Sequence, residues 1–139
     1  MSEIAVRSIV AGDAAGPALV LDEQVSFWGG FDAETGCVID QLHPQHGVCL
    51  TGAVVFMYSG RGSSSASSVL AEAVRLGTAP AAFVLEQPDE ILALGALVGE
   101  EIYGTATPIV IAARADTAEI ETGQQLAVTS SSIRVASSA

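Results

Sequence analysis

Three short apolar runs without charged residues constrain the fold of this chain more than any other feature. They cover residues 52–58, 81–85 and 108–112. A continuous apolar run is typical of a strand that is covered on both faces. Helices are expected between these runs, over residues 66–76, ending at Gly77, and from Pro88-Asp89-Glu90 to about residue 98. This order of strands and helices favours a parallel sheet at the centre of the fold.

The rest of the chain has the pattern of further strands and turns. Strands are expected over residues 4–10, 18–21 and 37–40, with short alternating strands within 117–135. A turn is expected at residues 12–17, and a loop at 43–47, because Pro44 disfavours a helix at His43. Residues 137–139 are expected to be frayed. No linker or internal repeat is visible, so we expect residues 1–139 to form one α/β (α+β) domain of sheet and helix layers.

The charge balance excludes some classes of partner. There are 16 acidic and five basic residues, all five of them Arg, and the formal net charge is −11. No broad positive face can form, which argues against nucleic-acid and anionic-membrane binding. The N-terminus does not resemble a signal peptide and the apolar runs are too short to span a bilayer, so a soluble, cytoplasmic protein is expected. Only 15% of the residues are charged, which suggests that a partner covers part of the surface.

A loop rich in serine and glycine, residues 59–68, joins the first buried run to the first helix. At such a junction the first N–H groups of the helix are unpaired and point toward the ends of the strands. Gly60 and Gly62 allow a ligand to approach the backbone, and Arg61 can bind a carboxylate with two hydrogen bonds. Together with the hydroxyls of Ser63, Ser64 and Ser65 they predict an anion site for a carboxylate or a phosphate. The alternative is an N-cap within a flexible loop.

Two cysteines and two histidines form a second candidate cluster: Cys37, His43, His46 and Cys49. Two thiolates and two imidazoles could bind zinc tetrahedrally. The close cysteine pair of most zinc sites is absent, however, and both cysteines lie in apolar, strand-like segments. Buried cysteines beside a surface loop are therefore the preferred interpretation. Two cysteines are too few for a disulfide framework.

Three other groups of residues each have two interpretations. Trp28, beside Gly29-Gly30, could belong to the core or to an interface. The acidic pairs Asp89-Glu90 and Glu100-Glu101 could be general bases, but a helix N-terminus and a solvated turn are preferred. No Ser/His/Asp triad can be assigned from the sequence.

Several motifs together resemble the small subunit of the aconitase X family. The resemblance runs from about Gly16 to about Ala112. It is carried by the segments Ser26-Phe27-Trp28-Gly29-Gly30-Phe31-Asp32, Thr35-Gly36, His43-Pro44, Gly60-Arg61-Gly62-Ser63-Ser64-Ser65, Gly77-Thr78-Ala79-Pro80-Ala81-Ala82, Asp89 and Gly95-Ala96. The Gly-Arg-Gly-Ser-Ser-Ser and Gly-Thr-Ala-Pro-Ala-Ala blocks, in this order and spacing, are the specific part of the match.

The resemblance implies a fold, a partner and a reaction. The fold would be a swivelling β/β/α domain of three layers, similar to the mobile domain of aconitase. Its partner would be a large subunit that carries an iron or iron–sulfur centre, with no cofactor in this chain. The complex would be a hydro-lyase. Bacterial members dehydrate cis-3-hydroxy-L-proline to Δ1-pyrroline-2-carboxylate, and archaeal members dehydrate mevalonate 5-phosphate. Archaeal chains more often have Lys at Arg61 and Thr at Ser64, which favours the hydroxyproline substrate.

The resemblance also assigns roles within the serine loop. Ser63 matches the family's catalytic serine, a base that removes the Cα proton, while Arg61, Gly62, Ser64 and Ser65 would bind substrate. A serine hydroxyl is a weak base unless its alkoxide is stabilised. Arg61 and the positive end of the following helix both favour negative charge there. Two alternatives remain: a small subunit of a mevalonate 5-phosphate dehydratase, and a stand-alone regulatory domain that binds an anion.

Overall fold

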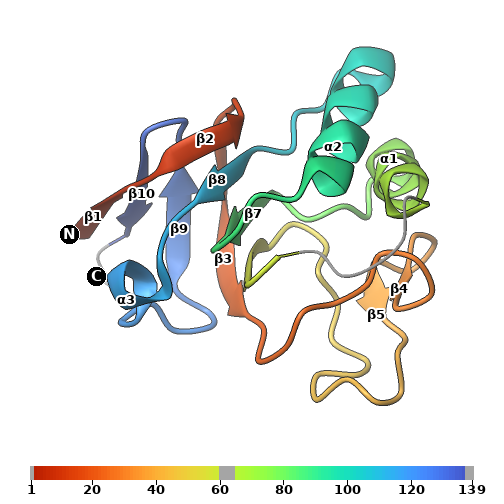
Figure 1. Ribbon diagram of the computed structural model, residues 1–139, viewed down its shortest axis with the longest axis horizontal. Helices are drawn as coiled ribbons and strands as arrows, with labels where there is room; N and C mark the ends of the chain where they lie inside the picture. The colour runs from red at the N-terminus through yellow and green to blue at the C-terminus, as the bar shows by residue number, and fades with distance from the viewer. Residues whose placement is uncertain (1, 60–64, 137–139) are drawn as a thin grey trace.

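The computed structural model describes residues 2–59 and 65–136, and most of its strands form one folded-over sheet with the two longer helices on one side (Figure 1). Eight strands pair in the order β1-β10-β9-β3-β6-β7-β8-β2. Their bounds are β1 Ser2–Ala5, β2 Arg7–Val10, β3 Ala14–Val20, β6 Val54–Met57, β7 Ala82–Leu85, β8 Ile109–Ile111, β9 Gln125–Val128 and β10 Ser132–Val135. Only Val6 separates β1 from β2, although they lie at opposite ends of this order. The sheet therefore folds back on itself into two layers.

The central parallel sheet matches the prediction. β3, β6, β7 and β8 are parallel to one another, and every residue of β6 and β7 is buried. Alternate side chains of β6 enter two different cores. Val54 and Phe56 pack between the two sheet layers, whereas Val55 and Met57 pack against the helices. The predicted three-layer β/β/α arrangement is confirmed.

The turn expected at residues 12–17 is wrong, because this segment forms most of β3. Its first half pairs antiparallel with β9, and from Ala18 onward it pairs parallel with β6. Pro17, which has no N–H, lies where the partner changes. A Cβ on Gly16 would lie only 2.2 Å from the carbonyl oxygen of Gly52. Glycine is therefore needed here for a close backbone approach and not for a turn.

Two long helices cover the parallel sheet. α1 spans Ala66–Leu76 as predicted and ends at Gly77 in the left-handed conformation. α2 spans Glu90–Tyr103, so it runs beyond the expected end at about residue 98 and stops at the left-handed Gly104. The helices touch closely, since a Cβ on Gly95 of α2 would lie 2.7 Å from the carbonyl oxygen of Ser67. The sequence did not predict α3, a single turn at Arg114–Thr117.

A small hairpin lies between β3 and β6 in the sequence. The strand expected at residues 37–40 is shorter, and it pairs as β5 (Cys37–Val38) with β4 (Phe31–Asp32). The ring of Phe27 stacks on Phe31 at 4.4 Å between centroids and contacts the edge of Phe83 at 5.5 Å. These aromatic contacts fix the hairpin to the main core. Among the described residues, no helix is long and apolar enough to cross a membrane.

Candidate functional site

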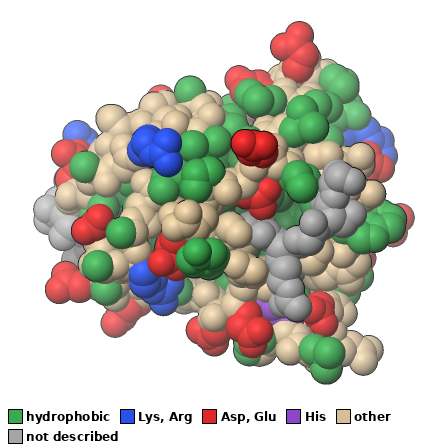
Figure 2. Space-filling model, viewed as in Figure 1, with side chains coloured by type: hydrophobic (Ala, Val, Ile, Leu, Met, Phe, Trp, Pro, Cys, Tyr) green, Lys and Arg blue, Asp and Glu red, His purple; other side chains and the backbone are tan. Residues whose placement is uncertain are grey.

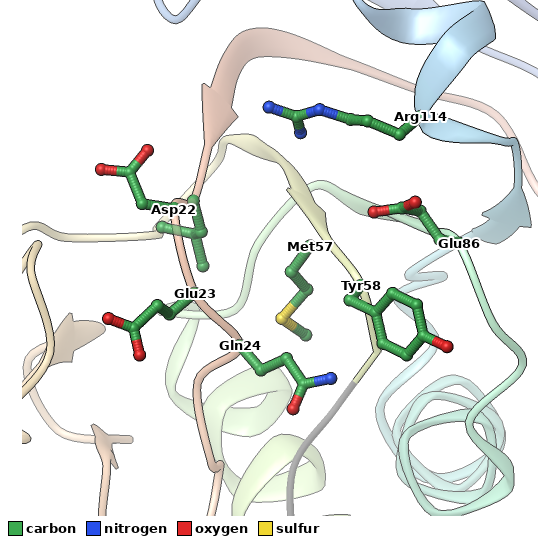
Figure 3. A pocket seen from close by; sticks show the side chains of 8 residues that line it. Asp22, Glu23, Gln24, Met57, Tyr58, Glu86 and Arg114 are labelled. Atoms are coloured by element: carbon green, nitrogen blue, oxygen red, sulfur yellow. The ribbon is translucent and has the colours of Figure 1, made fainter.

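A pocket of about 520 Å³ lies where the parallel strands end (Figure 3). Its lining residues follow, or lie at, the carboxyl ends of β3, β6, β7 and β8: Leu21, Asp22, Glu23, Gln24, Met57, Tyr58, Glu86 and Arg114. Ligands of α/β proteins bind preferentially beyond the carboxyl ends of parallel strands. This pocket is therefore the first candidate for a binding site in the described part of the chain.

The serine loop leaves the β6 strand at this same edge. Tyr58 lines the pocket, Ser59 follows it, and the loop returns at Ser65 to begin α1. The carbonyl group of Ser65 accepts the N–H groups of Ser68 and Val69 at 3.1 and 3.3 Å. Gly60, Arg61, Gly62, Ser63 and Ser64 lie outside the described residues. The anion site and the catalytic serine therefore stay predictions.

The pocket carries charges of both signs, and its one described cation is a residue that sequence reasoning missed. Asp22, Glu23 and Glu86 contribute carboxylates, and Arg114 a guanidinium. The described ion pairs join Arg75 to Glu72 and Arg134 to Glu3, and none involves Arg114. Arg114 follows the third buried run by two residues, so its place at the common strand edge could have been predicted. On the face seen in Figure 2, arginines are separate from one another and form no continuous basic patch.

His43 and Gln45 fix the acidic wall of the pocket. The Nδ1 atom of buried His43 accepts the N–H of Gln45 at 3.0 Å, so its Nε2–H donates to the carbonyl of Glu23 at 2.9 Å. The Gln45 side chain donates to the carbonyl of Val20 at 3.0 Å and accepts the N–H of Asp22 at 2.8 Å. The loop expected at 43–47 is confirmed, and it lies at the surface at Pro44, His46 and Gly47, whereas His43 is buried and Gln45 half-buried. Because both ring nitrogens of His43 bond to the backbone, neither is available for zinc.

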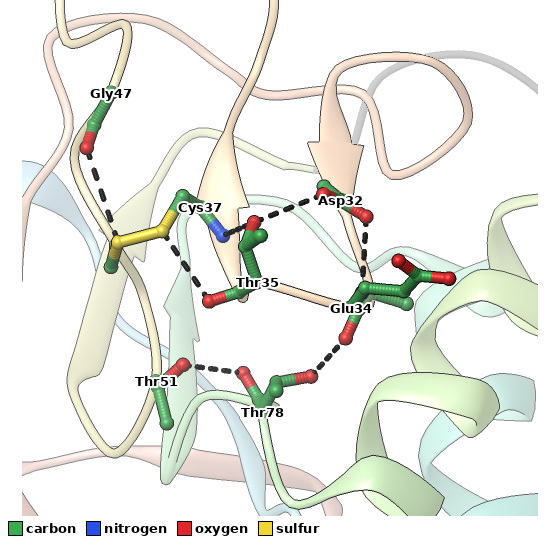
Figure 4. The surroundings of a disulfide bond; sticks show 9 residues. Asp32, Glu34, Thr35, Cys37, Gly47, Thr51 and Thr78 are labelled. Atoms are coloured by element: carbon green, nitrogen blue, oxygen red, sulfur yellow. Dashed lines mark hydrogen bonds between the residues drawn. A yellow bond between two sulfur atoms is a disulfide. The ribbon is translucent and has the colours of Figure 1, made fainter.

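The cysteines are neither a zinc pair nor free core residues. Cys37 and Cys49 form a disulfide, and Cys49 is exposed (Figure 4). They also form an antiparallel bridge between β5 and the chain before β6, which brings the two residues opposite each other. Sequence spacing alone does not reveal this pairing. In residues 2–59 and 65–136, no group of three or more His, Cys, Asp or Glu residues is arranged to hold a metal.

Several motif residues prove to hold the hairpin against α1. The hydroxyl of Thr78 donates to the carbonyl of Ala33 at 2.5 Å, and Thr51 donates to the carbonyl of Thr78 at 3.0 Å (Figure 4). Gly36 lies against this contact, since a Cβ there would be 2.1 Å from the Thr51 hydroxyl. The Thr35-Gly36 and Gly77-Thr78 motifs therefore have structural roles.

The positions of Trp28 and of the two acidic pairs distinguish between the interpretations that the sequence allowed. Trp28 is 59% exposed, so the core interpretation is wrong and the interface stays a prediction. Asp89 caps α2 by accepting the N–H groups of Ile91 and Leu92 at 2.9 and 3.0 Å, which confirms the helix N-terminus. Glu100 and Glu101 are exposed, but they lie on α2 and not in a turn.

Comparison with known proteins identifies relatives along almost the whole chain. A family model described as the aconitase X swivel domain matches residues 3–136. A cis-3-hydroxy-L-proline dehydratase of Pseudomonas aeruginosa is 49% identical over 106 residues, which are 76% of this chain and 18% of that protein. A phosphomevalonate dehydratase small subunit of Methanothermobacter thermautotrophicus is 42% identical over 96 residues, 69% of this chain and 73% of the relative. The chain thus spans about a fifth of the hydroxyproline dehydratases that it matches, 18% and 20% of the two.

A solved structure has the same fold. The chain superimposes on the crystal structure of holo aconitase X from Thermococcus kodakaraensis with a TM-score of 0.87 and 27% identity, covering 99% of this chain and 100% of the other. The family model, the relatives and the three-layer fold agree with one another. This chain belongs to the aconitase X swivel domain family.

Proposed function

We propose that this chain is the small subunit of a hydro-lyase that converts cis-3-hydroxy-L-proline to Δ1-pyrroline-2-carboxylate together with a large subunit. The placement of the serine loop carries this proposal. The loop leaves β6 directly beyond Tyr58, and Tyr58 lines the pocket at the carboxyl ends of the parallel strands. A base on this loop would lie beside a ligand in that pocket.

The charges of the pocket favour an amino-acid substrate. Its lining includes three acidic residues, Asp22, Glu23 and Glu86, and one arginine, Arg114. Hydroxyproline carries one positive and one negative charge, whereas phosphomevalonate carries a carboxylate and a phosphate, both anionic. Like charges at close range disfavour the second substrate. Two hydroxyproline dehydratases, of Pseudomonas aeruginosa and Hypocrea jecorina, are 49% and 41% identical to the chain over their alignments.

In the proposed reaction, Ser63 takes the Cα proton and the C3 hydroxyl leaves, so that the elements of water are lost. The resulting enamine tautomerises to the product. Arg61 and the N-terminal end of α1 favour the negative charge on the serine oxygen. Gly62, Ser64 and Ser65 bind the substrate. An iron or iron–sulfur centre, held by the large subunit, would supply Lewis-acid chemistry for the leaving hydroxyl.

A second candidate reaction is the dehydration of mevalonate 5-phosphate. It is favoured by a different observation: the alignment with the Methanothermobacter small subunit covers 73% of that chain. The two reactions need the same base and the same partner architecture. They differ in the charge of the substrate, so a direct comparison of both substrates separates them.

The test uses the complex of this chain with its large subunit and assays both substrates. Ser63→Ala should lower kcat by about 10²- to 10⁴-fold, the usual contribution of a general base, while subunit association is unchanged. Ser68→Ala is the matched control, since Ser68 is an exposed serine on α1, and it should keep full activity. More than about a tenth of the activity in Ser63→Ala would exclude Ser63 as the base. Tight anion binding by the chain alone, with no partner, would instead support a stand-alone regulatory domain.

A further inference from the structure

We propose that Arg114 binds the substrate carboxylate and that Glu86 binds the protonated ring amine. The assignment rests on the proposed function and adds two residues outside the serine loop. It makes the pocket a two-point recognition site for an amino acid. The pocket volume of about 520 Å³ lies within the range of small-molecule sites.

The guanidinium of Arg114 is available to a ligand. It extends from the first residue of α3 toward the end of β3, alongside the other side chains that line the pocket (Figure 3). The backbone around Arg114 is held on both sides. The N–H of Ala112 donates to the carbonyl of Leu85 at 3.0 Å, and the hydroxyl of Thr117 donates to the carbonyl of Arg114 at 3.4 Å. Among the described residues Arg114 forms no ion pair, although three carboxylates line the same pocket. Guanidinium groups bind carboxylates with two parallel hydrogen bonds, so a substrate carboxylate fits this position.

Glu86 provides the opposite charge. Its N–H donates to the carbonyl of Tyr58 at 2.9 Å, which fixes the residue directly after β7. In Figure 3 its carboxylate points toward the interior of the pocket, whereas the carboxylates of Asp22 and Glu23 point away from Arg114 and Glu86. A secondary ammonium has two N–H donors and no acceptor, so a carboxylate is the natural partner. Arg114 and Glu86 therefore match the two charged groups of one substrate.

The experiment measures substrate KM and inhibitor binding with the complete two-subunit enzyme. L-Proline offers a carboxylate and an ammonium, and pyrrole-2-carboxylate offers a carboxylate without an ammonium. Arg114→Gln should weaken the binding of both inhibitors and raise the KM for hydroxyproline, each by about 10- to 100-fold. This is the range for a lost charge-assisted hydrogen bond. Glu86→Gln should weaken the binding of L-proline by a similar factor. The affinity for pyrrole-2-carboxylate should stay within about twofold of the wild-type value.

Matched control variants separate binding from general damage. Arg7→Gln removes an exposed arginine on β2 and Glu101→Gln an exposed glutamate on α2, and both should keep wild-type KM and inhibition. Arg114→Lys should recover only part of the affinity, because lysine lacks the planar pair of donors.

The outcomes distinguish this assignment from the proposed function. If the wild-type enzyme dehydrates hydroxyproline and Arg114→Gln binds both inhibitors normally, the assignment is wrong and the proposed function stands. If Glu86→Gln lowers the affinity for both inhibitors equally, the contact between Glu86 and the amine is likewise refuted. If the wild-type enzyme dehydrates only phosphomevalonate, the proposed function fails, and the role of Glu86 fails with it.

Discussion

Substitution of His43 tests whether the cluster of Cys37, His43, His46 and Cys49 is a metal site or a structural support. We consider His43→Leu, which keeps a side chain of similar size but removes both ring nitrogens. The imidazole forms one hydrogen bond with Gln45 at 3.0 Å and one with Glu23 at 2.9 Å. Each such bond contributes about 0.5–1.5 kcal/mol, so the pair contributes about 1–3 kcal/mol to the free energy of unfolding. Both bonds are partly buried, so we take the middle of this range, about 2 kcal/mol.

The assay is thermal unfolding of the purified chain, with and without added zinc. For a domain of this size, a loss of about 2 kcal/mol corresponds to a Tm lower by roughly 6–10 °C. His46→Leu is the matched control because His46 lies in the same loop but is exposed, and its Tm should change little. Zinc should affect neither variant. Equal Tm values for His43→Leu and the wild type would refute the structural role. Zinc stabilisation that is lost in His43→Leu would restore the metal hypothesis.

Two further perturbations test the fold around the pocket. Gly16→Ala places a Cβ against a backbone carbonyl and should lower the free energy of unfolding by at least about 2 kcal/mol. The control Gly47→Ala, at an open left-handed position, should lower it by only about 1 kcal/mol. Equal denaturation midpoints for the two variants would contradict the close approach at Gly16. Reducing the Cys37–Cys49 disulfide, whose cysteines are 12 residues apart, should lower the free energy of unfolding by about 3 kcal/mol. Alkylation of the unfolded, unreduced chain should modify neither cysteine, and labelling of both would show that the bond is absent.

The central sheet could be predicted because its signal is local. β6, β7 and β8 are almost entirely buried, since one face packs on the second sheet layer and the other on the helices. A strand that is buried on both faces has apolar residues at every position, so it is visible in the sequence as a continuous apolar run. The start of α2 could also be predicted from a local signal, because Asp89 accepts the backbone N–H groups of the first turn of that helix.

The errors arose where a local signal has a tertiary cause. Glycine and proline at positions 16 and 17 have the composition of a turn, but Gly16 meets a carbonyl from a segment 36 residues away (52 − 16). Cys37 and Cys49 lie in apolar, strand-like segments that favour buried free cysteines, but the pairing of β5 with the chain near Cys49 brings the two sulfurs together in a disulfide. Neither contact leaves a periodic pattern in the sequence.

The pocket is a further case, because its walls come from four distant parts of the chain. Sequence reasoning found the serine loop as the continuation of one buried strand, β6, which ends at the edge of the sheet where the pocket lies. It missed Arg114 because it treated each strand separately. Parallel strands place all their carboxyl ends together, so Glu86 after β7 and Arg114 after β8 meet the segment after β3. Reading all the residues that follow buried runs as one group would have found them.

The exposure of this pocket limits what the chain can do alone. At about 4 Å, two opposite unit charges attract by roughly 1 kcal/mol in water but by about 4 kcal/mol at the effective dielectric constant of 20 that is typical near a protein surface. Asp22, Glu23 and Arg114 are exposed in the described structure. A partner that covers the pocket would exclude water from it and so strengthen the charged contacts with substrate. By thermodynamic linkage, bound substrate must strengthen the association of the subunits by the same factor as the partner strengthens substrate binding. In the proposed enzyme, substrate recognition and docking of the swivel domain are thus a single coupled equilibrium.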